Sequence, residues 1–167
     1  TRAGVYAADQ LFATLDTTSR KLWLEGAGNL VISDTVGFIR DLPHALVDAF
    51  HATLEAAVDA DLLLHVVDSA SHARDEQLQE VCKVLAEIGA QDVPQLIVWN
   101  KIDLTEATPG LERDEYGNIS RVRLSSRSGE GLELLRETLA EHARAKADSR
   151  RQAIDEAARL AQSDFIT

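Results

Sequence analysis

The chain has 167 residues, and its 17 Lys and Arg against 28 Asp and Glu give a net charge of −11. With 45% hydrophobic and 27% charged residues, it has the composition and length of one globular domain. The negative charge argues against binding nucleic-acid phosphates over the whole surface. No apolar run reaches the roughly 18 residues of a membrane span. The single cysteine, Cys82, cannot form an internal disulfide, which predicts a reducing, cytoplasmic location.

The first predicted elements are two strands joined by a tight turn. Residues 21–25 alternate between polar and apolar side chains, and residues 29–33 read as a returning strand after the glycines of 26–28. A helix is predicted to begin at Pro43, because proline is favoured at the first helical position. Its apolar residues at helical spacing are Val47, Phe50, Leu54 and Val58.

Strands and helices then alternate along the chain. Continuous apolar runs predict buried strands at 62–67 and 95–99, and an alternating pattern predicts another at 119–124. Between the first two lies a helix that ends near Gly89. Its apolar stripe comprises Leu78, Val81, Cys82, Leu85 and Ile88, so Cys82 is expected to pack in the core rather than to act as a nucleophile. The alternation predicts an α/β fold with a mostly parallel sheet.

The C-terminal part of the chain is predicted to be helical. Leu132, Leu135 and Leu139 have the spacing of an amphipathic helix. From about residue 148 the sequence reads as a charged helix whose apolar stripe is mostly alanine. A solvated terminal helix is the simpler interpretation, and a helix that binds a partner is the alternative.

Three predicted strands end in polar clusters: residues 32–37 (ISDTVG), 99–103 (WNKID) and 124–129 (LSSRSG). In open α/β sheets ligands bind beyond the carboxyl ends of the strands. Each cluster alone would be an ordinary loop. Together they resemble, in order and spacing, the nucleotide-binding motifs of Ras-like GTPases.

By this resemblance, Asp103 accepts two hydrogen bonds from the N1–H and 2-amino groups of guanine. Adenine lacks the amino group and would leave the carboxylate unpaired, a loss on the order of 10⁴–10⁵ in discrimination. Asn100 braces the loop, the stem of Lys101 lies across the base, and the Ser126 N–H meets the guanine O6. Ser125 and Arg127 complete the predicted base-binding set.

The phosphate end of the predicted site is carried by the first cluster. Asp34 is expected to hold Mg²⁺ through a water, and the Gly37 N–H to approach the γ-phosphate, where a side chain would obstruct it.

Other polar residues carry weaker signals. The five histidines show no metal-ligand spacing with Cys82, which argues against a zinc site. Asp59, Asp61 and Asp68 flank a predicted strand and are interpreted as solvated or capping residues.

A more specific resemblance extends over about residues 1–139. Four segments resemble HflX-type GTPases of the Obg/HflX branch: 6–16 (YAADQLFATLD), 34–44 (DTVGFIRDLPH), 49–55 (AFHATLE) and 65–68 (HVVD). The resemblance implies that Thr14 coordinates Mg²⁺ in the GTP state. Phe38 occupies the position of the water-orienting glutamine of Ras-like proteins, so no catalytic residue is assigned. The resemblance also implies that intrinsic GTP hydrolysis is slow and is stimulated by the large ribosomal subunit. The implied role is ribosome splitting or rescue under stress.

No G-x-x-x-x-G-K-[ST] phosphate loop occurs in the sequence. We therefore expect residues 1–147 to be a GTPase domain lacking its first strand and phosphate loop, followed by a charged helical tail at 148–167. By the resemblance, the missing strand lies between those ending at Asp34 and Asp68. We expect the chain to be unstable, or to close this gap by direct pairing, by swapping or with another chain.

Two functional hypotheses follow. The first is the nucleotide-binding part of a ribosome-associated GTPase that, as this chain alone, does not hydrolyse GTP. The alternative is a non-catalytic interaction fragment or short form that binds a protein or ribosomal partner.

Overall fold

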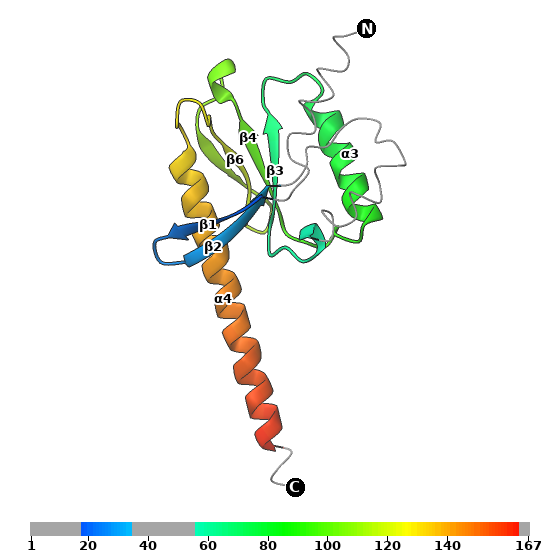
Figure 1. The fold of residues 1–167 in the computed structure, drawn as a ribbon, viewed down its shortest axis with the longest axis vertical. Helices are drawn as coiled ribbons and strands as arrows, with labels where there is room; N and C mark the ends of the chain where they lie inside the picture. The colour runs from blue at the N-terminus through cyan, green and yellow to red at the C-terminus, as the bar shows by residue number, and fades with distance from the viewer. Residues whose placement is uncertain (1–17, 35–55, 164–167) are drawn as a thin grey trace.

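The computed structural model describes residues 18–34 and 56–163 (Figure 1). The elements in chain order are β1 (Thr18–Leu24), β2 (Gly28–Asp34), β3 (Leu63–Asp68), α3 (Arg74–Glu87), β4 (Gln95–Asn100), the 3-10 helix η1 (Ile102–Leu104), β5 (Gly110–Arg113), β6 (Ile119–Arg123) and α4 (Leu132–Ser163). The helix predicted to begin at Pro43 lies outside the described residues, apart from its last turn.

The described strands form two sheets. One is the antiparallel hairpin β1–β2, and the other has the order β3-β4-β6-β5. Strand β4 pairs in parallel with both β3 and β6, whereas β5 is antiparallel to β6. The predicted α/β class and the antiparallel hairpin are confirmed, with the hairpin forming a sheet of its own, and the strand β5 was not predicted.

The β1–β2 hairpin turns at two glycines. Gly26 and Gly28 have φ values of +73° and +80°, a backbone region that other residues rarely adopt. The turn aligns Leu22 with Leu30, and both lie on the side of the hairpin that packs against the rest of the protein. The next residue along β1, Trp23, lies on the opposite side and is 62% exposed.

Helix α4 unites the two sheets. One buried cluster consists of Leu96 and Val98 of β4 with Val122 and Leu124, and Leu134 and Leu135 of α4 pack against it. A second cluster joins Leu24 of the hairpin to Leu139 and Ala140 of α4. Figure 1 shows the hairpin lying across the N-terminal half of α4. The hairpin is therefore held on the body by apolar contacts with this helix rather than by strand pairing.

The opposite face of the larger sheet carries charged and aromatic side chains on β4, β6 and β5. Trp99 of β4 is contacted by two guanidinium groups, with Arg74 at 4.9 Å and Arg121 at 4.3 Å from the ring centroid. Such cation–π contacts are attractive because the ring face carries negative charge. Glu112 of β5 pairs with both Arg121 and Arg123 of β6. The short strand β5 is thus joined to the sheet by charged side chains as well as by its backbone.

The prediction that Cys82 of helix α3 packs in the core is wrong. The helix buries Leu85, with Leu78 and Val81 half-buried, but Cys82 is exposed. At about 100° per residue, the buried side of the helix centres between Val81 and Leu85, and position 82 falls on its flank. The predicted stop is confirmed, because Gly89 has a φ of +78° just after the helix.

Strands β2 and β3 are not hydrogen-bonded to each other; they belong to separate sheets. Direct pairing, one of the expected ways to close the gap, is thus not found among the described residues. Both strands expose apolar side chains: Val31 of β2 is 64% exposed and Val66 of β3 is 66% exposed.

The predicted C-terminal helix is confirmed as part of α4, which continues without a break across residue 147. From Arg144 onward the described side chains of α4 are exposed. None of the helices in the described ranges is both long and apolar enough to cross a membrane.

We predict that Leu24→Ala lowers the free energy of unfolding by about 2–4 kcal/mol, because it leaves a cavity between the hairpin and α4. Trp23→Ala is the matched control. It removes a larger side chain from the exposed side of the same strand and should change stability by less than about 0.5 kcal/mol. Urea denaturation followed by circular dichroism measures both. Equal effects of the two substitutions would contradict the packing described here.

Candidate functional site

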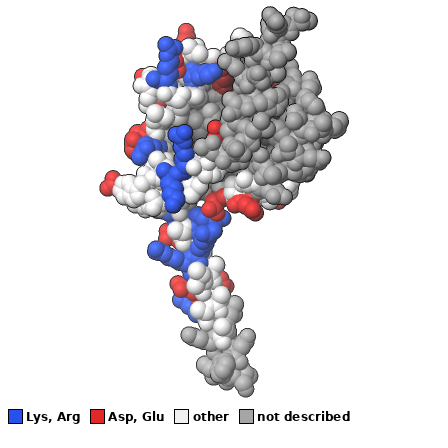
Figure 2. Space-filling view, viewed as in Figure 1, with Lys and Arg blue, Asp and Glu red and all other residues white. Residues whose placement is uncertain are grey.

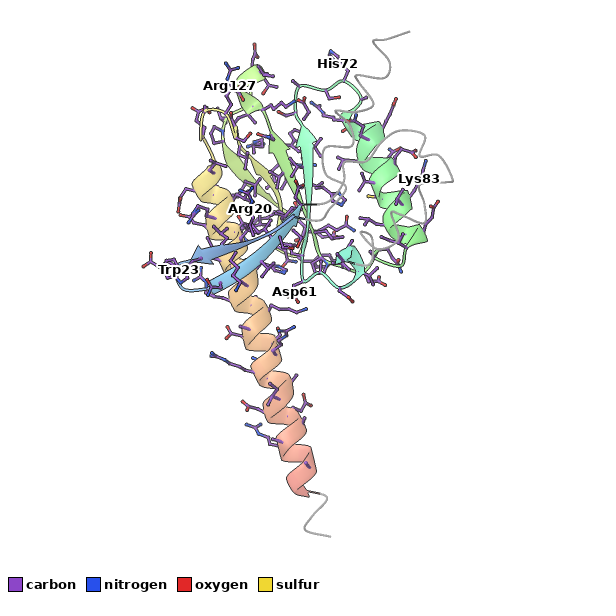
Figure 3. The ribbon with its side chains drawn as sticks, in the orientation of Figure 1. Arg20, Trp23, Asp61, His72, Lys83 and Arg127 are labelled. Carbon is purple, nitrogen blue, oxygen red and sulfur yellow. The ribbon has the colours of Figure 1, made fainter. Side chains whose placement is uncertain are left out.

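Two of the three predicted polar clusters meet at one edge of the larger sheet. The parallel register places Trp99 of β4 opposite Arg123 of β6, so both strands end at the same edge. The segments that follow, 100–104 and 124–130, therefore lie side by side. Figure 3 shows Arg127 at this end of the molecule, with Asp61 toward the opposite end.

Asn100 joins the two segments. Its Oδ1 accepts a hydrogen bond from the Lys101 N–H at 2.8 Å and another from the Ser126 N–H at 2.9 Å. Backbone bonds reinforce the junction, from Leu124 N to Trp99 O at 2.8 Å and from Ile102 N to Leu124 O at 3.3 Å. These bonds are the kind of contact that the predicted bracing role of Asn100 requires: its side-chain oxygen bonds to both loops.

The Ser126 N–H is already engaged in this arrangement. We predicted that this group meets the guanine O6, but here it donates to Asn100. Contact with a base therefore requires that the hydrogen bond be shared or exchanged.

Asp103 is held by a serine in the other loop. The Ser125 hydroxyl donates to Asp103 Oδ1 at 2.5 Å and accepts from the Ser128 N–H at 3.1 Å. Ser125 is fully buried, whereas Asp103 is exposed. A buried hydroxyl thus orients an exposed carboxylate, which remains accessible to a ligand.

Lys101 has an unusual backbone conformation. Its φ of 66° is the only positive value of a non-glycine residue in the described part of the chain. This conformation costs on the order of 1 kcal/mol and needs support from its surroundings. The hydrogen bond from its N–H to Asn100 and one from Leu104 N to its carbonyl at 3.0 Å provide that support.

Asp68 is a residue whose role the sequence reading missed. Its Oδ1 accepts the Ala70 N–H at 2.9 Å, which agrees with the predicted capping role, but its Oδ2 also pairs with Lys101 Nζ at 2.6 Å. The hydrogen bond from Lys101 holds the pKa of this carboxyl below its usual value, with a further contribution from the Ala70 N–H. The available signal was its position at the end of a buried strand that neighbours the strand carrying Asn100 and Lys101.

The predicted phosphate end is described only in part. Asp34 is the last residue of β2, is exposed and lies in the separate two-stranded sheet. Thr14, Gly37 and Phe38 lie outside the described residues. Carboxylate and hydroxyl oxygens, as in Asp34 and Thr14, are ligands that suit Mg²⁺. Within residues 18–34 and 56–163, no group of three or more His, Cys, Asp or Glu side chains could hold a metal ion.

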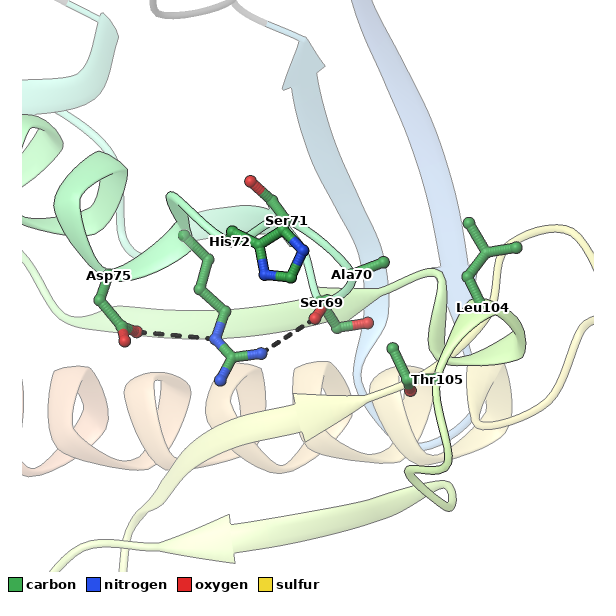
Figure 4. Close-up of a pocket in the computed structure, with 8 residues that line it drawn as sticks. Ser69, Ala70, Ser71, His72, Asp75, Leu104 and Thr105 are labelled. Atoms are coloured by element: carbon green, nitrogen blue, oxygen red, sulfur yellow. Dashed lines mark hydrogen bonds and ion pairs between the residues drawn. The ribbon is translucent and has the colours of Figure 1, made fainter.

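A separate polar hollow of about 480 Å³ lies beside the start of α3 (Figure 4). Its lining residues are Ser69, Ala70, Ser71, His72, Arg74, Asp75, Leu104 and Thr105. The Arg74 guanidinium spans it, donating to the Ser69 carbonyl at 3.0 Å and lying 3.8 Å from Asp75. No predicted nucleotide-binding residue lines this hollow, but it adjoins the Asn100 junction through Ser69, which bonds the Asn100 carbonyl, and through Leu104.

The sequence matches one protein family, described as 50S ribosome-binding GTPase, over residues 1–101. Among curated proteins it is 50% identical over 142 residues to GTPase HflX of Escherichia coli, covering 84% of this chain and 33% of that protein. It is 47% identical over 139 residues to GTPase HflX of Caldanaerobacter subterraneus, covering 83% and 31%.

The fold also resembles a solved structure, a GTP-binding protein from Sulfolobus solfataricus in complex with GDP. The TM-score is 0.63 at 30% identity, over 77% of this chain and 44% of that one.

The nucleotide motifs, the sheet and these similarities define part of a GTPase domain. The chain belongs to the 50S ribosome-binding GTPase family, and its resemblance to the HflX type is confirmed. It spans about a third of the length of the curated relatives named above.

We predict that Ser125→Ala destabilises the protein by about 1–3 kcal/mol, because it removes a buried hydroxyl that serves both Asp103 and the Ser128 N–H. Faster hydrogen exchange of the Ser128 amide should accompany the loss. Ser126→Ala is the control: it keeps the backbone N–H that binds Asn100 and alters an exposed side chain. A Ser125 variant as stable as the Ser126 variant would show that the buried hydroxyl does not hold the loop.

Proposed function

We propose that the loops after β4 and β6 bind the guanine base of GTP and GDP. The observation that carries the proposal is the Asn100 junction, which brings Lys101, Asp103, Ser125 and Ser126 to one edge of the sheet. Membership in a GTPase family supports it, as does the similarity to a GTP-binding protein whose structure contains GDP.

Each residue has a distinct task in this proposal. Asp103 accepts the N1–H and 2-amino hydrogens of guanine while Ser125 holds the carboxylate in place. The stem of Lys101 covers one face of the base. Arg127, exposed in the loop between β6 and α4, supplies further contact at the rim of the base. An adenine base would leave the carboxylate without its donors.

A protein that contains these 167 residues together with a phosphate loop, called the full-length product below, is proposed to hydrolyse GTP with Mg²⁺ as cofactor. Thr14 and Asp34 would bind the metal and the Gly37 N–H would meet the γ-phosphate. With Phe38 in place of glutamine, hydrolysis depends on another group. The 167 residues alone are proposed not to hydrolyse GTP appreciably, because they contain no G-x-x-x-x-G-K-[ST] loop to cradle the phosphates.

The proposed partner of the full-length protein is the large ribosomal subunit, in the cytoplasm, with a role in splitting or rescue under stress. The family description supports ribosome binding. Despite the charge of −11, basic side chains gather locally: Figure 2 shows Lys and Arg running along the hairpin and α4. Arg144, Lys146, Arg150 and Arg151 are exposed members of this group.

A division into a GTPase domain at 1–147 and a helical tail at 148–167 is proposed as well. It is supported by the change to exposed side chains from Arg144 onward. The same exposed half of α4 favours the second candidate function, a non-catalytic module that binds a protein or ribosomal partner.

The proposal is tested by titrating fluorescent GDP and GTP, with Mg²⁺, into this chain and into the full-length product, with ATP as competitor. We expect guanine-selective binding by the full-length product and weak or no binding by the 167 residues alone. Tight binding by this chain would show that its phosphate contacts do not require the loop motif. Absence of binding by both would refute the proposed function.

For the full-length product, Asp103→Asn should shift preference from GTP toward xanthosine triphosphate by at least about tenfold, because the amide can donate to the carbonyl at position 2 of xanthine. Competition between the two nucleotides measures the shift. Asp92→Asn is the control, since Asp92 is an exposed carboxylate that pairs with Gln91 beyond α3. Unchanged guanine preference in the Asp103 variant would remove this residue from the site.

Self-association is the last part of the proposal. Strands β2 and β3 are not paired with each other and expose Val31 and Val66, so strand addition by a second copy is favourable. Val66→Lys should reduce a concentration-dependent rise in mass measured by light scattering. Val58→Lys is the control, because Val58 is 42% exposed but lies outside the strands. A strictly monomeric wild-type chain would exclude self-association.

A further inference from the structure

We propose that Asp68 is a positioning residue for the guanine site, which sets nucleotide affinity by holding the Lys101 side chain. The inference rests on the proposed guanine-binding function. Asp68 ends β3, Lys101 follows β4, and the two side chains meet with Oδ2 and Nζ 2.6 Å apart. The pair therefore links the carboxyl ends of two neighbouring parallel strands across 33 residues of sequence.

Lys101 needs such a partner. Its side chain has four rotatable bonds and is 51% exposed, so alone it would sample many rotamers. The structure fixes it at both ends: the backbone N–H bonds Asn100 Oδ1, and the ammonium bonds Asp68. The stem between them, the part proposed to cover the base, is thereby confined before any ligand arrives.

Asp68 is itself held firmly enough to act as an anchor. Its other carboxylate oxygen accepts the Ala70 N–H. The next residue, Ser69, donates both its N–H and its hydroxyl to the Asn100 carbonyl, at 2.9 and 2.7 Å. The backbone of Asn100 is thus bonded to Ser69, just after β3, and its side chain is bonded to the loops after β4 and β6.

The pair differs from ordinary surface ion pairs of this protein. Lys83 and Glu80 are three residues apart on α3 and both about two-thirds exposed, a local pair of the common helical type. Asp68 and Lys101 come from separate elements, and Lys101 has a left-handed backbone. Because an exposed ion pair adds little to folding stability, we expect this one to act mainly on ligand binding.

The experiment is a double-mutant cycle on GDP affinity in the full-length product, with Asp68→Asn and Lys101→Met. The amide retains an oxygen for the Ala70 N–H but loses the charge that holds Lys101, and methionine retains the stem without the ammonium. Asp68→Asn should weaken GDP binding about tenfold with Lys101 present and less than about twofold with Met at that position. Asp61→Asn is the matched control at the other end of β3, where Asp61 pairs with Lys146 and Arg150.

The outcomes separate the two proposals. No GDP binding by the wild-type product overturns the proposed function and this inference with it. GDP binding that Asp68→Asn leaves unchanged or strengthens overturns the inference alone, as does an equal loss in both Lys101 backgrounds. A loss confined to the Lys101 background, with Asp61→Asn unaffected, supports the positioning role.

Discussion

The side-chain oxygen of Asn100 is the contact on which the geometry of the candidate site depends. It accepts N–H groups from Lys101 and Ser126, which begin loops of two different strands. Without it, the positive φ of Lys101 would lose one of its supports, and the two loops would lose one of the hydrogen bonds that join them, beside the direct bond from Ser125 to Asp103. A carboxylate could accept the same two bonds. It would, however, add negative charge beside Asp68 and Asp103, so a neutral amide suits the position better.

The rest of the fold keeps this edge of the sheet in place. The α4 face of β4 and β6 is apolar and packs on the helix, while the opposite face is held by Trp99, two arginines and Glu112. The hairpin that carries Asp34 is attached by apolar packing on α4 and on Leu64 of β3, and not by strand pairing with β3. Asn100, proposed to hold the guanine loops, and Asp34, proposed to bind Mg²⁺, therefore belong to separate sheets, and α4 packs against both.

Much of this arrangement could be predicted from the sequence. Apolar runs identified β3 and β4, the glycine-rich turn identified the hairpin, and the polar strand ends located the Asn100 junction, because parallel strands end at one edge. Strand β5 was missed because its four residues have no apolar alternation and are stabilised by ion pairs with β6. The role of Asp68 was missed for a related reason: its partner is 33 residues away, and no local pattern reveals such a contact.

Helix α4 has different physical support at its two ends. Leu139 and Ala140 are buried, but from Arg144 onward the described residues of the helix are exposed and bury no side chain. This stretch of about 20 residues, about 30 Å long, depends on local propensity and, near its start, on the ion pairs of Lys146 and Arg150 with Asp61. Its helical order will therefore be lost gradually on warming, turn by turn from the free end, whereas the packed half melts together with the sheet.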